Sequence, residues 1–420
     1  MAFDKIFESN EFDNICSVLY GNSFQKRKEA YKVLSDMHLK GQGKEPEEFY
    51  SASGRIEIVG NHTDHNGGKV LCSAVTIDTL SAVSRRDDGL ILVKSKGYPI
   101  IKVTVDDTNF KMGEVGTSQA IIRGILAYFK GAGAKVGGFT AYTSSSVPKG
   151  SGVSSSSAFE LLIAEILNSL YNDGKLDKVF KAKASQYAEC AYFGKPCGLM
   201  DQSAISLGGV NMIDFRSFEN PVINRAEWKF DDLDIYVIAT GGDHCDLTDD
   251  YAAIPKEMRE VADLLGGKIL ADIPSKKFFS EKANLVGKVS ERALLRAEHF
   301  YEENARVEKA YNSINSGDEK AFLEAVNESG LSSRYKLQNL YSPKSKSHLI
   351  EEALDKIEGM NGVVAKRVHG GGFAGTILVF VKKDSSNDAN EQFKCLFGEN
   401  NVFKLSVRPY GAMKVAEVIK

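Results

Sequence analysis

Residues 148–158 read PKGSGVSSSSA and lead into a helix that the spacing of apolar residues predicts to continue to about residue 171. Small residues let a loop backbone approach a ligand closely, and the free amides at a helix N-terminus attract anions. Serine hydroxyls can supplement those amides or reach a phosphate-bound Mg²⁺. The loop contains neither GxxxxGKS/T nor GxGxxG, which excludes the two commonest nucleotide motifs. The stretch therefore predicts either a phosphate-binding loop or a flexible loop that only caps the helix.

A polar turn follows a predicted strand earlier in the chain, where residues 54–68 read GRIEIVGNHTDHNGG. Its clustered donors and acceptors suit a neutral, hydroxyl-rich ligand. An exposed polar turn would have the same composition. A third interpretation is a metallohydrolase centre on His62, His65 and Asp64, with residues 243–246 (DHCD) as further ligands. Against it, the two histidines lie on a loop, and no third ligand motif is apparent.

A glycine-rich stretch lies near the end of the chain, where residues 367–376 read RVHGGGFAGT. Three successive glycines between a strand and a further apolar run suggest close backbone approach to a ligand, such as a phosphate. Glycine clusters also make plain turns. Alone, this stretch does not decide between the two.

The composition is that of a soluble globular enzyme, with 43% hydrophobic and 26% charged residues. Fifty-three basic residues nearly balance 56 acidic ones, which argues against nucleic acid or an anionic membrane as the main partner. We find no apolar run near the roughly 18 residues that span a bilayer, and no secretion signal at the N-terminus. The six cysteines form no CxxC pair and fit reduced thiols. We therefore expect a cytoplasmic enzyme. The sequence does not reveal the oligomeric state, and a monomer is the expectation.

Strands and helices are mixed without strict βαβ alternation, which predicts an α+β fold. We expect strands at 55–59, 70–77, 80–84, 90–93, 101–105, 139–143, 210–215, 235–239, 362–368, 376–381 and 404–409. We expect helices within 1–48 and at 118–130, from the serine-rich loop to 171, and at 180–193, 252–265, 289–315, 318–330 and 347–358. The length of 420 residues exceeds one compact core, so we predict two α+β domains, residues 1–210 and 211–420.

Together, in this order and at this spacing, the three stretches resemble the motifs of the GHMP small-molecule kinases, and within them the galactokinase family. Residues 54–68 are similar to a signature in which a strand precedes Gly-Glu-His-Thr-Asp-Tyr. Residues 148–158 resemble the phosphate loop Pro-x-Gly-x-Gly-Leu-Ser-Ser-Ser-Ala, and residues 370–375 resemble Gly-Gly-Gly-Phe-Gly-Gly. A fourth stretch, CGLMDQ at 197–202, is similar to the segment that carries the catalytic aspartate of the family. The motifs extend from about residue 54 to 375, most of the chain.

The resemblance implies a two-domain GHMP-kinase-like architecture with the active site in the cleft between the domains. It also implies ATP-dependent phosphorylation of a sugar, galactose first, at its anomeric hydroxyl. Asp201 matches the base that accepts the O1 proton, and Arg55 matches the arginine beside it. A positioned carboxylate contributes roughly 10²–10⁴-fold to such a proton transfer. A neighbouring guanidinium keeps that carboxylate ionised and offsets charge on the transferring phosphoryl group. The alternative for this pair is a purely structural ion pair.

The resemblance further implies the residues that hold ATP, Mg²⁺ and the sugar. Glu189 matches an acidic group associated with Mg²⁺, and Ser155 or Ser156 matches the serine on the metal or phosphates. The implied metal ligands are thus Ser156 and Glu189. The implied sugar contacts are Asn61, His62, Asp64, Gly198 and Tyr251, the last through a variable stretch. The implied nucleotide contacts are Pro148, Gly150, Ser151, Gly152, Ser154, Ser155, Ser156, Gly371 and Gly372.

The informative departure from the family pattern is Asn61, which replaces a glutamate that points at the C6 hydroxyl of the sugar. That glutamate would oppose a substrate carboxylate, because two like charges about 4 Å apart cost roughly 4 kcal/mol at an effective dielectric near 20. Asparagine removes this cost, so a uronic acid such as galacturonate becomes admissible. Asparagine also hydrogen-bonds a neutral hydroxyl, so galactose stays first. A catalytically silent sugar and ATP sensor is a further alternative, against which the presence of Asp201, Arg55 and Glu189 argues.

Overall fold

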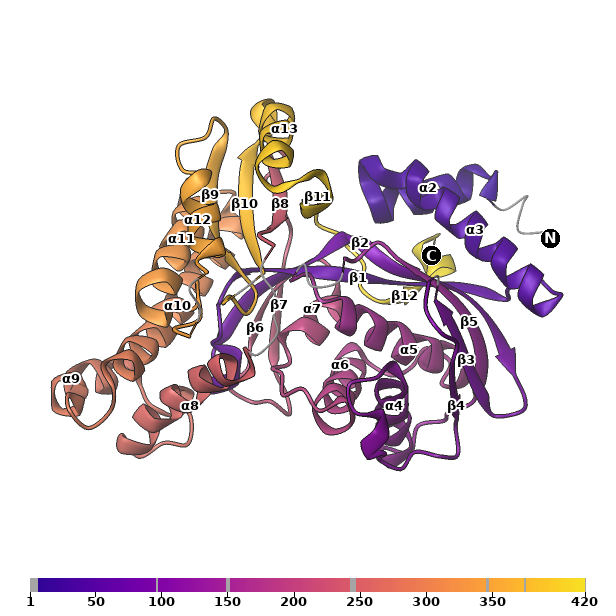
Figure 1. Cartoon of the computed structure of the whole chain (residues 1–420), viewed down its shortest axis with the longest axis horizontal. Coiled ribbons are helices and arrows are strands. Elements are labelled where there is room, and N and C mark those ends of the chain that lie inside the picture. The colour runs from indigo at the N-terminus through magenta and orange to yellow at the C-terminus, as the bar shows by residue number, and fades with distance from the viewer. Residues whose placement is uncertain are drawn as a thin grey trace.

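The structure is a computed structural model that describes residues 7–95, 97–148, 152–241, 247–344, 347–373 and 375–419. Two β-sheets and their covering helices make up the molecule (Figure 1). Gly150 and Ser151 of the predicted phosphate loop lie outside the described residues, as do the predicted alternative ligands at 243–246. The α+β fold class is confirmed.

The larger sheet has eight strands. Six of them follow one another in the order β12 (Met413–Lys414), β1 (Glu48–Val59), β2 (Lys69–Arg86), β5 (Gly138–Ser145), β3 (Leu90–Ser95) and β4 (Ile101–Thr104). In addition, β6 (Val210–Asp214) pairs with β2 and with β7 (Val222–Ala226). The two predicted strands at 70–77 and 80–84 form one strand, β2, since a register shift at Ser53/Gly54 lets it stay paired with β1.

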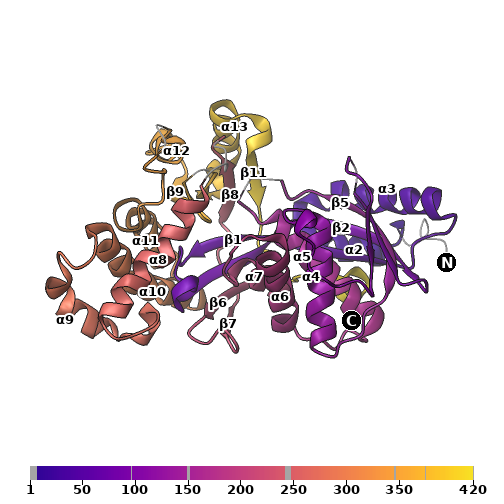
Figure 2. The same ribbon diagram turned by 60° about the horizontal axis from the view of Figure 1, so that its bottom comes forward.

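Helices cover both faces of this sheet (Figures 1 and 2). On one face lie α2 (Asn10–Tyr20) and α3 (Phe24–Gln42). On the other lie α4 (Ser118–Gly131), α5 (Ser155–Tyr171), α6 (Lys178–Tyr187) and α7 (Met200–Leu207). Helix α5 packs its apolar side chains, such as Leu162 and Ile166, against β1 and β2, where they are fully buried. This packing fixes the N-terminus of α5, and with it the end of the serine-rich loop, next to β1.

The smaller sheet is antiparallel, in the order β11 (Val402–Leu405), β8 (Leu233–Ala239), β10 (Thr376–Lys382) and β9 (Val363–His369). Helices α12 (Leu349–Lys356) and α13 (Ser386–Phe397) pack on it. Helices α8 (Thr248–Leu264), α9 (Ser275–Leu285), α10 (Glu291–Ser316) and α11 (Glu319–Ser332) lie at the end of the molecule opposite α2 and α3 (Figure 1). Within the described ranges, we find no helix long and apolar enough to cross a membrane.

The far end of the β1–β2 hairpin connects the two halves of the molecule. In the turn after β1, the amide of Gly60 donates to Glu303 Oε1 on α10 at 2.9 Å, and at the start of β2 the amide of Lys69 donates to Asn304 Oδ1 at 2.6 Å. The polar turn of residues 61–65 therefore lies between the larger sheet and the C-terminal helices. Strand β6 begins at residue 210, β7 and β12 follow it, and all three still belong to the larger sheet. A domain division at residue 210 stays a prediction.

Candidate active site

Arg55 and Asp201, which are 146 residues apart in the chain, form a bidentate ion pair. Arg55 Nε donates to Asp201 Oδ1 at 2.7 Å, and Arg55 Nη2 donates to Asp201 Oδ2 at 2.8 Å. Arg55 lies on β1 and Asp201 in the first turn of α7. The guanidinium side chain is 6% exposed, whereas the aspartate side chain is 32% exposed. The prediction that these two groups meet at a solvent-reachable position is confirmed.

The carboxyl of Asp201 is held in its ionised form. Burial alone would raise its pKa, but the charge and hydrogen bonds of Arg55, the hydroxyl of Ser154 and the charge of Lys195 outweigh burial. The pKa of Asp201 therefore lies below its ordinary value of 3.8. At neutral pH the group is a carboxylate, the form that can accept a proton.

The serine-rich loop joins this pair through Ser154, the residue before α5. Its backbone is left-handed (φ 61°, ψ 58°), and its side chain does not cap the helix. The hydroxyl instead donates to Asp201 Oδ2. Ser154 was expected among the nucleotide contacts, and the structure places its hydroxyl on the carboxylate. The first amides of α5 consequently lack the side-chain cap that an N-cap serine normally provides.

The glycine-rich stretch near the end of the chain packs against the serine-rich loop beside Arg55. Gly152 has a φ of +68°, and a Cβ on it would lie 2.2 Å from Thr376 Oγ1 on β10. Its carbonyl accepts a hydrogen bond from Arg55 Nη1. A Cβ on Gly370 would lie 3.7 Å from Gly152 O and 3.8 Å from Arg55 Nη2. The three stretches that were singled out in the sequence therefore converge around Arg55.

Two predicted sugar contacts, His62 and Tyr251, lie beside the glycine turn of residues 370–372. His62 Nε2 donates to Gly371 O at 2.9 Å, and the Tyr251 hydroxyl donates to Gly372 O at 3.0 Å. Burial lowers the pKa of His62 to about 3, so its ring is neutral. The backbone carbonyls of Gly371 and Gly372, expected beside the nucleotide, are thus engaged by predicted sugar contacts.

Asp64 and Gly198 are in direct contact. A Cβ on Gly198 would lie 1.8 Å from Asp64 Oδ2, so only glycine fits beside this carboxylate. Gly198 is three residues before Asp201, which brings Asp64 to the edge of the Arg55–Asp201 pair. The structure therefore brings His62, Asp64, Gly198 and Tyr251 to one region of the site.

Asn61 differs from the other predicted sugar contacts, because it is fully buried and its side chain is engaged by protein groups. Its Nδ2 donates to Glu57 Oε1 at 2.8 Å and to Gly370 O at 2.6 Å. Its Oδ1 accepts from Asn339 Nδ2 at 2.7 Å and from Ser333 Oγ at 3.3 Å. A carboxamide can donate two hydrogen bonds through its NH₂ group and accept two through its oxygen, so these four bonds use its full hydrogen-bonding capacity. The side chain has no polar group left for a sugar.

A second carboxylate cluster surrounds Glu189, which is 2% exposed. Its Oε1 accepts from Lys195 Nζ at 3.1 Å and from Ser156 Oγ at 3.4 Å, and its Oε2 accepts from Gln202 Nε2 at 2.8 Å. Ser156 and Glu189, the two implied metal ligands, are thus in direct contact. Lys195 and Gln202 were not predicted, because nothing in their spacing marks them as partners of Glu189.

Of the other predicted nucleotide contacts, Ser155 is the first residue of α5, and Pro148 ends the described segment before the loop. The metallohydrolase alternative gains no support from the described residues, which contain no group of three or more His, Cys, Asp or Glu side chains that could hold a metal ion. The rings of His62 and His65 are stacked with centroids 5.9 Å apart.

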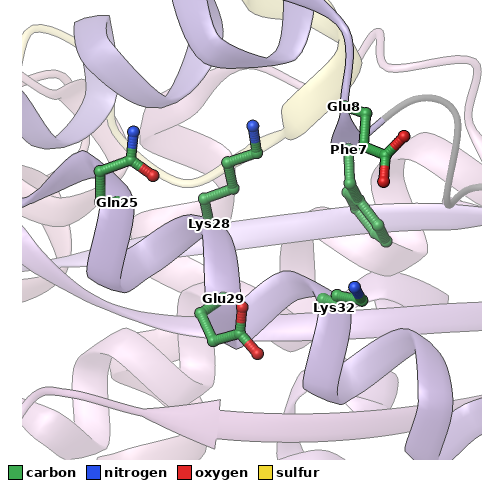
Figure 3. Close-up of a pocket in the computed structure, with 6 residues that line it drawn as sticks. All are labelled: Phe7, Glu8, Gln25, Lys28, Glu29 and Lys32. Atoms are coloured by element: carbon green, nitrogen blue, oxygen red, sulfur yellow. The ribbon is translucent and has the colours of Figure 1, made fainter.

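A cavity of about 390 Å³ opens beside the sugar contacts. It is lined by His65, Cys197, Gly198, Phe218, Arg259, Lys268, Ile269 and Asp272. A smaller hollow of about 160 Å³ lies between the N-terminal segment and α3 (Figure 3). Its lining residues are Phe7, Glu8, Gln25, Lys28, Glu29 and Lys32, none of them a predicted site residue. The larger cavity, which includes Gly198, is therefore the one that adjoins the site.

Comparisons with known proteins show which families this chain resembles. The GHMP kinases N terminal domain model matches residues 120–209, and the galactokinase galactose-binding signature matches residues 38–85. Galactokinase of Clostridium tetani is 31% identical over 376 residues, which cover 86% of this chain and 89% of that protein. Human galactokinase is 30% identical over 386 residues, which cover 88% and 93%.

Solved structures show the same fold. The structure of Lactococcus lactis galactokinase complexed with galactose superimposes with a TM-score of 0.79 at 24% identity, covering 92% of this chain and all of that chain. A mevalonate kinase superimposes with a TM-score of 0.60 at 14% identity, over 86% of this chain and 98% of that chain.

Fold, motifs and site together define a GHMP kinase, an enzyme that uses ATP to phosphorylate a small molecule, here a sugar. Within that class, the chain belongs to the galactokinase family.

Proposed function

We propose that this protein transfers the γ-phosphoryl group of ATP to O1 of galactose, with Asp201 as the base. The observation that carries the proposal is the bidentate Arg55–Asp201 pair beside the end of the serine-rich loop. A sugar hydroxyl is a poor nucleophile until a base accepts its proton, and a positioned carboxylate provides that base.

The hydrogen bonds of Asp201 leave room for a substrate hydroxyl. Its Oδ2 already accepts from Arg55 and Ser154, whereas its Oδ1 accepts only from Arg55 Nε among the described residues. A carboxylate oxygen has two lone-pair sites, so Oδ1 can accept one more hydrogen bond. In the proposed complex, the O1 hydroxyl donates to Oδ1, and Arg55 holds the carboxylate in place.

The phosphates of ATP would lie against the N-terminus of α5. Its amides carry partial positive charge, and the side chain of Ser154 does not cap them. Ser155 and Ser156 add hydroxyl donors at the same position. Arg55, directed at Gly152 and Asp201, would offset negative charge on the transferring group.

The residues around Glu189 fit a magnesium ion in the type of donor that they offer. Mg²⁺ prefers oxygen ligands, and it commonly uses one or two carboxylates together with substrate phosphates. Glu189 and Ser156 supply a carboxylate and a hydroxyl, and the nearby buried Glu160 Oε1 and Gln202 Oε1 have no hydrogen-bond partner among the described residues. Glu189 and Ser156 would hold the ion, which would neutralise charge on the β- and γ-phosphates. Lys195 would then leave Glu189.

Galactose is the first candidate because the matched signature covers the turn with His62 and Asp64. Galacturonate is the second candidate. Asn61 does not support it, because its side chain is bonded to protein groups. A different observation does. Arg259 and Lys268 line the cavity beside Gly198 and form no ion pair with any described residue. These two cations would favour a sugar that carries a carboxylate.

The test is a substrate panel of galactose, galacturonate, N-acetylgalactosamine and glucose, each with ATP and Mg²⁺. ADP release measures turnover, and the phosphorus–proton coupling of the product identifies the phosphorylated oxygen. The proposal predicts the highest kcat/KM for galactose, with the phosphate on O1. A higher value for galacturonate would select the second candidate. Sugar binding without ADP release from any of the four would identify a silent sensor instead.

A further inference from the structure

Two cysteines lie side by side at the edge of the site. Cys190 belongs to a π-helical segment, Ala188–Phe193, and Cys197 directly precedes Gly198. Their sulfur atoms are 3.6 Å apart. Cys190 is exposed and Cys197 is partly exposed, so small reagents can reach the pair from solvent.

The backbone holds the two sulfurs together. Gly194 ends the π-helical segment with a φ of +87° and lets the chain reverse. The amide of Lys195 then donates to Glu189 O at 3.0 Å, and Gln186 Nε2 donates to Cys197 O at 3.2 Å. Cys197 is thereby fastened to the helix that carries Cys190, and the proximity does not depend on side-chain rotation alone.

The other described cysteines have no comparable neighbour. Cys16 and Cys72 are buried, and Cys395 is exposed on α13 without a second sulfur nearby. Among the described residues, Cys190 and Cys197 are therefore the pair with the geometry to react with each other. A disulfide needs the sulfurs at about 2.05 Å, so the pair must close by roughly 1.5 Å.

We propose that Cys190 and Cys197 are a reversible oxidation site whose disulfide lowers kinase activity. With hydrogen peroxide, the Cys190 sulfur attacks one peroxide oxygen, the O–O bond breaks, and one water leaves after protonation. The Cys197 sulfur then attacks the sulfenic acid at Cys190, the S–S bond forms, and a second water leaves. The two thiols lose two protons and two electrons, and the peroxide gains them. A small-molecule thiol reverses the step.

The consequence for activity follows from what adjoins each cysteine, and this part rests on the proposed function. Gly198, next to Cys197, lies against the Asp64 carboxylate with no space for a side-chain atom. Glu189, next to Cys190, contacts Ser156 and Gln202. Pulling the two segments together shifts both positions, and a displacement near 1 Å can cost up to about 100-fold in rate. We expect the oxidised protein to lose about tenfold or more in kcat/KM for the sugar.

The test treats the full chain with hydrogen peroxide and follows two independent readouts. Peptide mapping without reductant should find a Cys190–Cys197 linked peptide, and dithiothreitol should remove it. The rate of ADP release should fall in parallel and recover with dithiothreitol. Each rate is divided by the rate of the same protein before treatment, so that the basal rates of variants do not matter.

Two serine variants sharpen the test. Cys190→Ser should form no linked peptide and keep its untreated rate, whereas Cys395→Ser should respond like the wild-type protein. Absence of the linked peptide in the wild-type protein, or equal loss of activity in Cys190→Ser, would overturn the proposal. A linked peptide without any loss of rate would overturn the regulatory part. If the untreated protein releases no ADP with any sugar, the proposed function fails, and peptide mapping still decides whether the oxidation site exists.

Discussion

Strand β1 takes part in two arginine–carboxylate pairs, two residues apart, with opposite surroundings. In the first, Arg55 holds Asp201, whose side chain is 32% exposed. In the second, Glu57 accepts from Arg367 Nη2 at 2.9 Å, and the two side chains are 4% and 0% exposed. The pKa of Asp201 is lowered, whereas burial raises the pKa of Glu57 despite the opposing charges of Arg367 and Arg55.

The difference separates an ion pair that solvent can reach from one that is fully buried. Asp201 is ionised and reachable, so it can take a proton from a bound hydroxyl. Glu57 lies under Asn61 and Arg367, where β1 meets β9, and it connects the two sheets. The same two residue types therefore form a solvent-reachable pair at one position and a fully buried pair at the other.

The largest expected effect is that of Asp201→Asn on turnover. The variant keeps the shape of the side chain and loses the base, so kcat should fall by roughly 10²–10⁴-fold, with sugar binding largely retained. ADP release and calorimetric titration with galactose measure the two quantities. Asp173→Asn, which changes an exposed carboxylate paired with Lys175, is the matched control and should turn over at the wild-type rate. If Asp201→Asn keeps more than about a tenth of the activity, Asp201 is not the base.

The second effect is on stability, at the structural pair. Glu57→Gln leaves Arg367 buried without its counter-ion, which should lower the free energy of unfolding by about 3–5 kcal/mol. Glu48→Gln on the same strand, whose partner Lys414 is 26% exposed, should cost less, about 1 kcal/mol. Denaturant unfolding measures both. Equal losses in the two variants would remove the distinction between the ion pairs.

The third prediction concerns pH. Because the pKa of Asp201 lies below 3.8, the carboxylate stays ionised as the pH falls toward that value, so Asp201 gives no acid limb in kcat/KM above it. In Arg55→Gln, burial is no longer opposed by Arg55, so the pKa rises and the acid limb moves to higher pH. Profiles of kcat/KM for the two proteins give the comparison. Identical acid limbs would show that Arg55 does not set the ionisation of Asp201.

The smallest effect should come from Lys195→Met. Removing the ammonium group frees Glu189 for the metal. Because Lys195 is 62% exposed, solvent partly screens its ion pair with Glu189, so Lys195 competes only weakly with the metal. We expect the Mg²⁺ concentration for half-maximal rate to fall roughly three- to fivefold. Lys175→Met, at an exposed lysine, is the control. An unchanged Mg²⁺ dependence would argue against Glu189 as a ligand.

The sequence was sufficient for the fold class. Its resemblance to the galactokinase family was sufficient for the Arg55–Asp201 pair, since both residues lie inside motifs that match that family. It was not sufficient for Asn61. Its bond partners Ser333 and Asn339 lie 272 and 278 residues away, and no local pattern marks them as neighbours. Ser154 shows the same limit, because its hydroxyl does not cap the helix and donates instead to Asp201, which lies 47 residues further along the chain.

The most direct test of the central claim is a crystal structure of Asp201→Asn with galactose and a non-hydrolysable ATP analogue. We predict O1 of the sugar within about 3.2 Å of the residue 201 side chain, facing the terminal phosphate at the N-terminus of α5. A sugar bound with O1 directed into the cavity of Arg259 and Lys268, away from residue 201, would contradict the account.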